Sequence, residues 1–558
     1  MKKKIPALLL SALVLLSGCQ TTTENSSLSV NAATTPETVV DTASMFSERD
    51  LSGEYDESTA VPIKLEGDRI SCDSDAVSVD GTCLTLTDGG TYLISGTLSD
   101  GQIVVDADET DKVQLVLSGV EITSSDSAAI YSLNADKVFV TLAEGTDNTL
   151  TNGGTYAAVD ENHIDAVIFS KTDLTLNGSG SLAIQAQAGH GVVSKDELSI
   201  TAGSYTVTAA EHGLVGKDSL AVAGGTFQIT SGKDGLHAEN NEDRTKGSLY
   251  IKDGTYKIHA QADAVSASGA LQVDKGIFDF TTGEGSASVT MPTEDLFAPG
   301  GPGGLPAERP QREPPNRGEE PSQPSGSTEN RPPEQPPAQP NQEEPFSKAS
   351  NSETGDSVSQ KGIKSDAALL VNGGVFTIDS ADDCIHSAGV LTINAGEFTL
   401  SSGDDALHSD DGVVIQDGTF SIPYCYEGIE GHCVTVNGGD FAITAQDDGF
   451  NAAGGADNSG FGDRGDQFAV DENAFITING GNIIVTSKGD CMESNGDLTI
   501  NGGVMDLTCN GGGNTTLDCN GTYANNGGTV TTNDNAQANP SGMGGGRPMG
   551  GQKQRPMG

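Results

Sequence analysis

The stretch SADDCIHSAGVLTINAGEF, residues 380–398, is followed after three residues by SGDDALHSDDGVVIQDGTF, residues 402–420, and the two share one pattern. Each has a pair of aspartates, an aliphatic residue and a histidine, and then alternating apolar residues around a glycine. When Asp383 and Asp405 are taken as equivalent, the same place recurs along the chain, mostly every 21 or 22 residues. A short fixed period is typical of stacked repeats and not of independent domains.

Two markers define the repeat. The places that align with Asp383 are Asp165, His190, His212, Asp234, Asp263, Lys361, Asp405, Glu427, Asp448, Asp490 and Gly512. The second marker, a glycine two residues before an apolar one, falls at Gly203, Gly225, Gly254, Gly276, Gly374, Gly396, Gly418, Gly439, Gly481 and Gly503. The spacing of both markers increases at the same places in the chain, so the longer steps are insertions between intact units.

Within a unit the apolar residues alternate, as at Leu391, Ile393, Phe398 and Leu400, around an Asn-x-Gly corner. Such alternation predicts short β-strands, and glycine suits a corner that needs left-handed backbone. A unit of 22 residues cannot close a core alone, so we expect the units to stack about 4.8 Å apart. The predicted fold is an all-β parallel β-helix, or solenoid, of about 12 regular coils.

Composition divides the chain further. Most of its 22 prolines fall in one long insert, which we expect to be disordered and partly polyproline-like. We expect a signal peptide at 1–18, a flexible tether at 19–60, irregular β coils at 61–160, regular coils at 161–282, the proline-rich insert at 283–358, coils with an acidic ladder at 359–535 and a Gly/Met-rich tail at 536–558.

The N-terminus has the order of an export signal: three lysines, the apolar run ALLLSALVLL, and then LSGC ending at Cys19. Small residues before a cysteine resemble the bacterial lipobox, in which cleavage leaves Cys19 to carry lipid. This predicts lipid anchoring at the outer membrane or cell surface, the alternative being an ordinary signal with a chance cysteine. Export makes disulfides the default for the other cysteines, with Cys72–Cys83 and Cys425–Cys433 as local pairs.

The charge limits the partners. The chain has 79 acidic and 29 basic residues and a formal charge of −50. Such a surface repels phosphate backbones, which argues against a nucleic-acid partner, and it favours polycations, divalent metals and ligands bridged by metals.

Stacking would place the acidic residues of successive coils above one another. Two like charges about 5 Å apart repel by about 3 kcal/mol at an effective dielectric near 20. Protonation, interleaved bases or a bound cation would relieve this, and Ca²⁺ takes six to eight oxygen ligands. We therefore predict Ca²⁺ sites between the coils; the alternative is solvated turn carboxylates. The predicted ligands are Asp382, Asp383, Asp404, Asp405, Glu427, Asp447 and Asp448.

A further column, predicted to face outward, flanks the inward Ile385 and Leu407. Two histidines in this column suggest a transition-metal site, but they lack a fixed third ligand. The simpler interpretation is that the column consists of polar residues on the surface. The column consists of Lys364, His386, His408, Glu430, Asn451 and Glu493.

At this point the chain resembles the bacterial carbohydrate-binding domain-containing proteins, through residues 90–131, the run LAEGTDNTL and the repeats of the type DDxxHSxxxLTINxG. The resemblance covers about residues 61–530. It implies a right-handed β-helix of the pectate-lyase fold class that binds calcium and plant-type polysaccharides such as pectin or cellulose. The coils that hold His190, His212 and Lys361 depart from the family's acidic pattern, so no metal is implied there.

Three functions compete. In the first, Ca²⁺ bridges the acidic ladder to a uronate polymer such as polygalacturonate. Cellulose is implied by resemblance, but the chain has no tryptophan. Tyr424, Tyr426 and Phe450 are the expected exposed rings, the alternative being that they pack in the core or at its rim. In the second, a polysaccharide lyase uses Ca²⁺ and a lysine base, Lys361 or Lys488; neutralisation of the carboxylates is the simpler role for these lysines. The third is a structural or adhesive surface rod.

Overall fold

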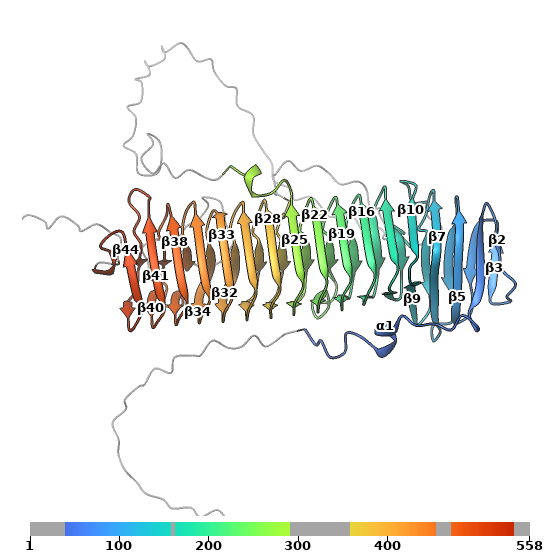
Figure 1. The fold of residues 1–558 in the computed structure, drawn as a ribbon, viewed down its shortest axis with the longest axis horizontal. Helices are drawn as coiled ribbons and strands as arrows, with labels where there is room; N and C mark the ends of the chain where they lie inside the picture. Colours follow the sequence, from blue (N-terminus) through green and yellow to red (C-terminus); the bar gives the residue numbers. More distant parts are fainter. Residues whose placement is uncertain (1–39, 158–161, 291–357, 453–469, 539, 541–558) are drawn as a thin grey trace, which may run out of the picture. The chain divides into compact units, whose positions relative to one another are not determined.

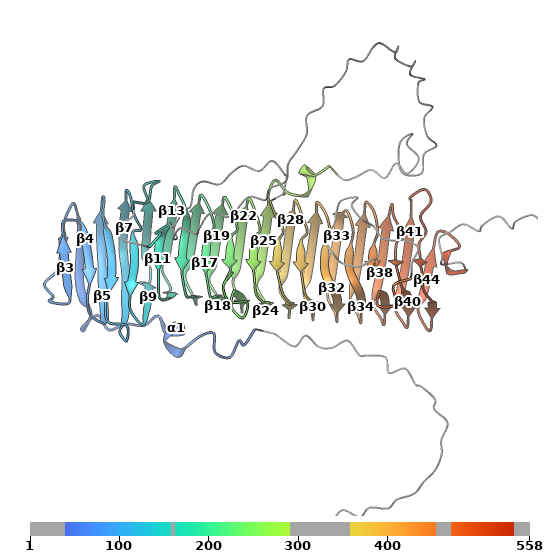
Figure 2. The ribbon, with the colours of Figure 1, turned by 180° about the vertical axis from the view of Figure 1, so that it is seen from behind.

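The structure is a computed structural model, and it describes residues 40–157, 162–290, 358–452, 470–538 and 540. These residues form almost only β-strands, and nearly all pairs are parallel. Figures 1 and 2 show the labelled strands following one another in chain order along the molecule, from β3 at one end to β44 at the other. The predicted signal peptide, Cys19, nearly all of the proline-rich insert and most of the tail lie outside the described residues.

In the regular part each strand pairs with the strand three places further on, so one coil contributes one strand to each of three parallel sheets. This pairing is that of a β-solenoid. The first sheet contains β1 (Val61–Gly67), β5 (Gly90–Leu98), β7 (Lys112–Ser124), β10 (Asp147–Asn152), β13 (Ser181–Ala186), β16 (Ser204–Ala209), β19 (Thr226–Ser231), β22 (Thr255–Ala260), β25 (Ile277–Thr282), β28 (Val375–Ser380), β31 (Glu397–Ser402), β33 (Thr419–Cys425), β35 (Asp440–Ala445), β38 (Asn482–Ser487), β41 (Val504–Cys509) and β44 (Thr529–Thr532).

The second sheet contains β4 (Cys83–Leu86), β6 (Gln102–Asp106), β8 (Ile130–Asn134), β11 (Ala166–Ser170), β14 (His190–Ser194), β17 (Leu214–Gly216), β20 (Leu236–Ala238), β23 (Val265–Ala267), β26 (Ile363–Ser365), β29 (Ile385–Ser387), β32 (Leu407–Ile415), β34 (Ile429–Val436), β36 (Phe450–Ala452), β39 (Glu493–Ser494) and β42 (Asp518–Cys519).

The third sheet contains β9 (Lys137–Leu142), β12 (Asp173–Gly178), β15 (Glu197–Ile200), β18 (Ser219–Val222), β21 (Ser248–Ile251), β24 (Leu271–Val273), β27 (Leu369–Val371), β30 (Leu391–Ile393), β37 (Phe475–Ile478), β40 (Asp497–Ile500) and β43 (Tyr523–Asn525). The long strands β7, β32 and β34 also pair within this sheet. Near the N-terminal end, β2 (Ile70–Ser71) and β3 (Val77–Asp80) pair antiparallel with β1 and β4. Two short 3-10 turns, η1 (Ser286–Ser288) and η2 (Ala536–Ala538), complete the set.

The core is a set of ladders of equivalent side chains. Leu391, Ile393, Phe398 and Leu400 are buried, as their alternation predicts. One ladder is aromatic: the rings of Phe376, Phe398 and Phe420 stack with centroids 4.8 and 4.6 Å apart. The register also passes over the proline-rich segment without a break, because β25 pairs directly with β28.

The glycine marker reflects a backbone requirement. Gly396 has φ of +142°, and a Cβ there would lie 2.8 Å from the ring of Phe398. Both the conformation and the lack of space exclude a larger side chain.

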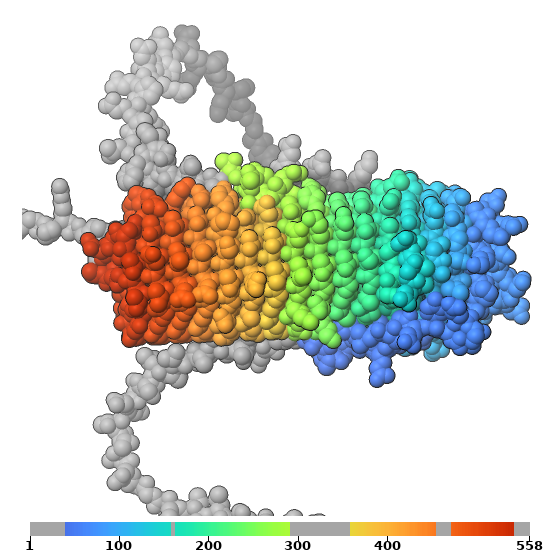
Figure 3. Space-filling model, viewed as in Figure 1, coloured from blue at the N-terminus to red at the C-terminus, as the bar shows by residue number. Residues whose placement is uncertain are grey.

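Part of the predicted tether is packed against the sheets. Helix α1 (Glu48–Ser52) carries Asp50, whose buried carboxylate receives Thr175 Oγ1 at 2.5 Å and Lys137 Nζ at 2.9 Å. The prediction of a flexible tether over 19–60 is therefore wrong for this part, because one aspartate satisfies polar groups of the third sheet. The space-filling view shows this N-terminal segment lying against the coils (Figure 3).

The cysteines also differ from the prediction. In the described part of the chain all eight are free thiols. Cys425 is buried in the core, whereas Cys433 is half-buried on another strand, so the expected local pair is not formed. Across the described ranges, no helix is long and apolar enough to span a membrane.

Candidate functional site

The residues that align with Asp383 form one column at the corner between the first and second sheets, called here the corner column. Its members in the described coils are Asp165, His190, His212, Asp234, Asp263, Lys361, Asp383, Asp405, Glu427, Asp448 and Asp490. The prediction of Gly512 as the next member is wrong: Thr515 takes that place, because its backbone N–H is bound by Asp490 Oδ1 and the last coil is longer by three residues. Most side chains of the corner column accept a hydrogen bond from the backbone N–H of the next member. The accepting atoms are His190 Nδ1, His212 Nδ1, Asp234 Oδ1, Asp263 Oδ1, Asp383 Oδ1 and Asp448 Oδ1, at 2.5 to 3.2 Å.

This bonding explains the residue types of the corner column. The strand ladder breaks at the corner, and a buried N–H without an acceptor is costly. The four aspartates and two histidines named above reach the next coil and accept its N–H, whereas a lysine side chain has no acceptor atom. At Lys361 the exception is compensated, because the N–H of Asp383 is bound instead by Asp382 Oδ1 at 2.9 Å.

Lys361 neutralises the first part of the acidic ladder. Its ammonium lies 2.8 Å from Asp382 Oδ1 and 2.7 Å from Asp383 Oδ2, and only 6% of its side chain is exposed. Burial alone would raise the pKa of Asp383, but the Lys361 charge and the hydrogen bond of His386 hold it well below its usual range. The same two carboxylates raise the pKa of Lys361 against the effect of its burial. Lys361 is therefore a fixed cation and is unsuited to act as a base.

The column that was predicted to face solvent is largely buried. His386 and His408 are 6% and 2% exposed, and their rings stack with centroids 4.7 Å apart. His386 Nδ1 lies 3.0 Å from Asp383 Oδ2, and His408 Nδ1 lies 2.8 Å from Asp405 Oδ2. The prediction of surface polar positions is wrong for these histidines, because the corner column packs beside them and supplies partners three residues earlier in sequence.

His408 is also held by Glu430, with Nδ1 3.0 Å from Oε2, and by Asp410, with Nε2 3.2 Å from Oδ1. Burial lowers the pKa of His408, but the hydrogen bond to Glu430 and the charges of Asp383 and Glu430 outweigh it and raise the pKa to about 10. His408 thus has further carboxylate partners, Asp410 and Glu430, that the sequence did not assign to it.

In the coils from Glu427 onward, the corner column and the neighbouring histidine column carry mainly carboxylates. Burial, together with the charge of Glu430, raises the pKa of Glu427 well above its usual range. Burial and the charge of Glu493 do the same for Asp448. Burial also raises the pKa of Asp490, to about 7. Carboxyl oxygens of Asp448, Asp490 and Glu493 approach within 4.8 Å of one another.

Asn451 lies inside this group. Its Nδ2 donates to Glu427 Oε2 at 2.7 Å, while its Oδ1 is buried without a hydrogen-bond partner among the described atoms. In register it stands between Glu430 and Glu493. We call Glu427, Asp448, Asn451, Asp490 and Glu493 the acidic cluster. The atoms that this cluster could offer to a metal ion are carboxylate and amide oxygens, which are the ligands that Ca²⁺ prefers.

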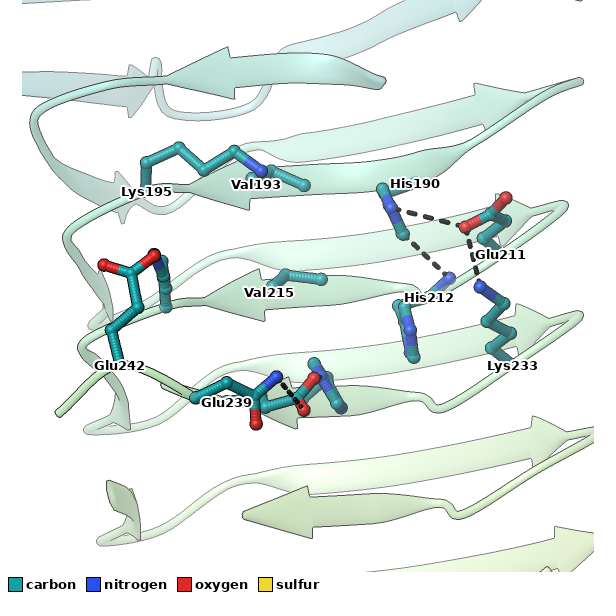
Figure 4. A pocket seen from close by; sticks show the side chains of 12 residues that line it. His190, Val193, Lys195, Glu211, His212, Val215, Lys233, Glu239 and Glu242 are labelled. Carbon is teal, nitrogen blue, oxygen red and sulfur yellow. Dashed lines mark hydrogen bonds and ion pairs between the residues drawn. The ribbon is translucent and has the colours of Figure 1, made fainter. Parts of the chain in front are cut away.

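The opposite half of the same corner is different. A groove with a volume of about 370 Å³ is lined by His190, His212 and His237 together with Glu211, Lys217 and Lys233. We call it the histidine groove, and Figure 4 shows its side chains on successive coils. The rings of His190 and His212 stack at 5.1 Å, and those of His212 and His237 at 4.2 Å.

The remaining predicted residues lie as follows. Tyr424 and Tyr426 are half-buried. Phe450 is not an exposed ring, because it packs edge-on against Phe441 in the core. Asp447 and Asp404 flank the corner column. Lys488 is exposed and its Nζ donates to Gln446 Oε1 at 2.6 Å, so this lysine is bound on the surface. Sequence reasoning missed Glu211 and Lys233, although both immediately precede members of the corner column.

Comparison with known proteins gives three findings. A family model described as carbohydrate-binding domain-containing protein matches residues 80–406 and 404–548. A protein of Acetivibrio thermocellus with the same description is 39% identical over 150 residues, which is 26% of this chain and 52% of the relative. The match thus spans about half the length of that curated relative. A solved polysaccharide lyase-like protein from C. thermocellum, a gadolinium derivative, is 37% identical and covers 40% of this chain and 92% of its own, with a TM-score of 0.39.

Proposed function

This chain belongs to the family of carbohydrate-binding domain-containing proteins, and from that premise we propose that it binds an acidic polysaccharide such as polygalacturonate with the help of Ca²⁺. The ion would be held at the acidic cluster and supply the positive charge that a chain with a net charge of −50 needs for an anionic ligand.

The buried, unpartnered Oδ1 of Asn451 carries this proposal. A buried carbonyl oxygen without a donor is costly, and it lies beside Glu427, whose pKa is raised because burial opposes its charge. A divalent cation would satisfy the amide oxygen and the carboxylates together. Glu427, Asp448, Asn451, Asp490 and Glu493 would hold it.

The proposal moves the predicted metal site along the ladder. Asp382 and Asp383 already bind Lys361, and Asp405 binds His408. An ion at those carboxylates would have to compete with a fixed positive charge. Glu427 and Asp448, which were also predicted ligands, remain in the proposed set.

The lyase alternative is weaker for the same reason: Lys361 is held protonated by two carboxylates, and Lys488 lies on the exposed surface. Binding without cleavage is the function that these residues support. Anchoring to a membrane through Cys19 remains a prediction, and it would place the binding sites outside the cell.

The test is retention of the purified chain on immobilised polygalacturonate in Ca²⁺ and in EDTA, with the polymer length measured afterwards. We expect retention only in Ca²⁺ and an unchanged polymer. Glu427→Gln should reduce retention strongly, while Asp417→Asn, an exposed aspartate in a turn, should leave it unchanged. Equal retention in Ca²⁺ and EDTA would refute the calcium role, and shortening of the polymer would favour the lyase.

A further inference from the structure

The histidine groove lies apart from the acidic cluster, and its chemistry points to another kind of ligand. The first observation is the protonation of its imidazoles. His190 Nδ1 accepts the backbone N–H of His212, and His212 Nδ1 accepts that of Asp234. A neutral ring that accepts at Nδ1 carries its proton on Nε2. Both rings therefore carry an N–H donor at Nε2, and that of His190 lies 3.4 Å from Glu211 Oε2, a contact that a ligand would have to share or replace.

This arrangement disfavours a metal. His212, Asp234 and His237 offer atoms within 4.8 Å of one another, as a metal site would. The His212 atom nearest to this group is Nδ1, which lies 3.4 Å from Asp234 Oδ2, and to bind a metal it would have to give up the backbone N–H of Asp234. Burial lowers the pKa of His190 to about 4, in keeping with a ring that stays neutral.

The second observation is the charge balance. Three lysines and three glutamates line the groove: Lys195, Lys217, Lys233, Glu211, Glu239 and Glu242. Two of the resulting ion pairs, Lys233–Glu211 at 3.0 Å and Lys217–Glu242 at 3.2 Å, involve exposed or half-exposed side chains. Such pairs are weak and can open to a ligand. Because the lysine and glutamate charges balance, the groove has no net attraction for a polyanion. A ligand with both hydrogen-bond donors and acceptors could bond to the glutamates and to the lysines.

The third observation is an apolar strip beside these polar groups. Val193 and Val215 line the groove and are in register on neighbouring coils (Figure 4). Apolar C–H surface next to hydroxyls that donate and accept is the surface of a neutral sugar. The groove continues past His237 into a second hollow of about 450 Å³ that reaches Lys364, so a chain of several sugars would lie along the coils.

We propose that the histidine groove binds a neutral, hydroxyl-bearing oligosaccharide without calcium, through Nε2–H of His190 and His212 and the flanking lysine and glutamate side chains. The inference rests on the carbohydrate-binding function proposed above, but it does not rest on the calcium site. The chain would then hold two saccharide sites of different chemistry along one corner.

The test is isothermal titration calorimetry of the whole chain in EDTA, with neutral hexasaccharides of glucose, xylose and mannose and with hexagalacturonate. We expect at least one neutral hexasaccharide to bind and hexagalacturonate not to bind. His212→Asn removes the ring donor but keeps a side-chain acceptor for the Asp234 N–H. A short side chain can fill this role, because Asp234 itself accepts the N–H of Asp263. The variant should weaken binding about tenfold, as expected for one lost hydrogen bond.

Two further variants keep the test decisive. Lys217→Met leaves the corner column intact and should also weaken binding, whereas His259→Asn, the same change at an exposed histidine outside the groove, should have no effect. The proposal is overturned if none of the neutral sugars binds, or if binding is indifferent to both groove variants. Retention on polygalacturonate in Ca²⁺ is measured on the same preparation. If that retention is present while no neutral sugar binds, the histidine groove proposal fails and the proposed calcium-dependent function stands.

Discussion

Asp383 Oδ1 accepts the backbone N–H of Asp405, one coil further on, at 3.0 Å. The other carboxylate oxygen of Asp383 lies 2.7 Å from Lys361 Nζ and 3.0 Å from His386 Nδ1. One side chain thus joins a backbone hydrogen bond, a buried ion pair and the outer histidine column. Repeated aspartates at this corner have a structural role as well as any role in binding.

The first prediction concerns the acceptor. Asp263 Oδ1 receives the Lys361 N–H at 2.8 Å and Ser359 Oγ at 2.7 Å. Asp263→Ala leaves that buried N–H without a partner and should lower the free energy of unfolding by about 1–3 kcal/mol. Asp263→Asn keeps an acceptor and should cost clearly less. Urea denaturation of both variants checks this, and equal costs would contradict the acceptor role.

The second prediction concerns the buried charge pair. Lys361→Met leaves Asp382 and Asp383 without their cation and should destabilise the fold by about 3–5 kcal/mol. Asp383→Asn should be costly for the same reason. In a double-mutant cycle the combined variant should cost less than the sum of the two. Additive costs would show that the two side chains do not interact.

The third prediction concerns pH. Burial raises the pKa of Asp490 from 3.8 to about 7, so the folded state binds more protons than the unfolded state between these values. Stability from this group is present below pH 3.8 and is lost as the pH rises to about 7, by about 4 kcal/mol at most. In EDTA, the free energy of unfolding should therefore fall over this window. Asp490→Asn should flatten the dependence, which chemical denaturation at several pH values would reveal.

The same pH series should be measured in Ca²⁺ for comparison with the series in EDTA. An ion at the acidic cluster stabilises the charged carboxylates, so the loss of stability toward pH 7 should shrink. If the pH dependence is identical in Ca²⁺ and EDTA, the ion does not bind at Asp490 and its neighbours.

The fourth prediction concerns the N-terminal segment. Asp50→Ala removes the partner of Lys137 and Thr175 and should release residues 40–57 from the third sheet. Hydrogen exchange of this segment should become much faster, while exchange in the core strands stays slow. Asp41→Ala, at an exposed position, is the control. Unchanged exchange in Asp50→Ala would show that the segment is held by its apolar contacts instead.

Much of the fold follows from the repeat. Residues such as Leu391 and Phe398 alternate with polar ones, and Gly396 marks the corner, because stacked coils demand the same side chain at the same place. The sequence also brings Asp383 and Asp405 into one column. It could not show that Lys361 lies on two carboxylates, since that depends on the direction in which a long side chain runs between coils.

The sequence by itself determined the parallel stacking and, up to Asp490, which residues share a column, because both repeat markers keep the same steps; beyond Asp490 the last coil is three residues longer than the sequence predicted. Only the tertiary structure decided which columns are buried. The corner folds two columns against each other, so His386 and His408 are enclosed by carboxylates, and the orphaned oxygen of Asn451 meets the acidic cluster. Burial and partner choice depend on contacts between side chains of neighbouring columns, which no spacing along the chain encodes.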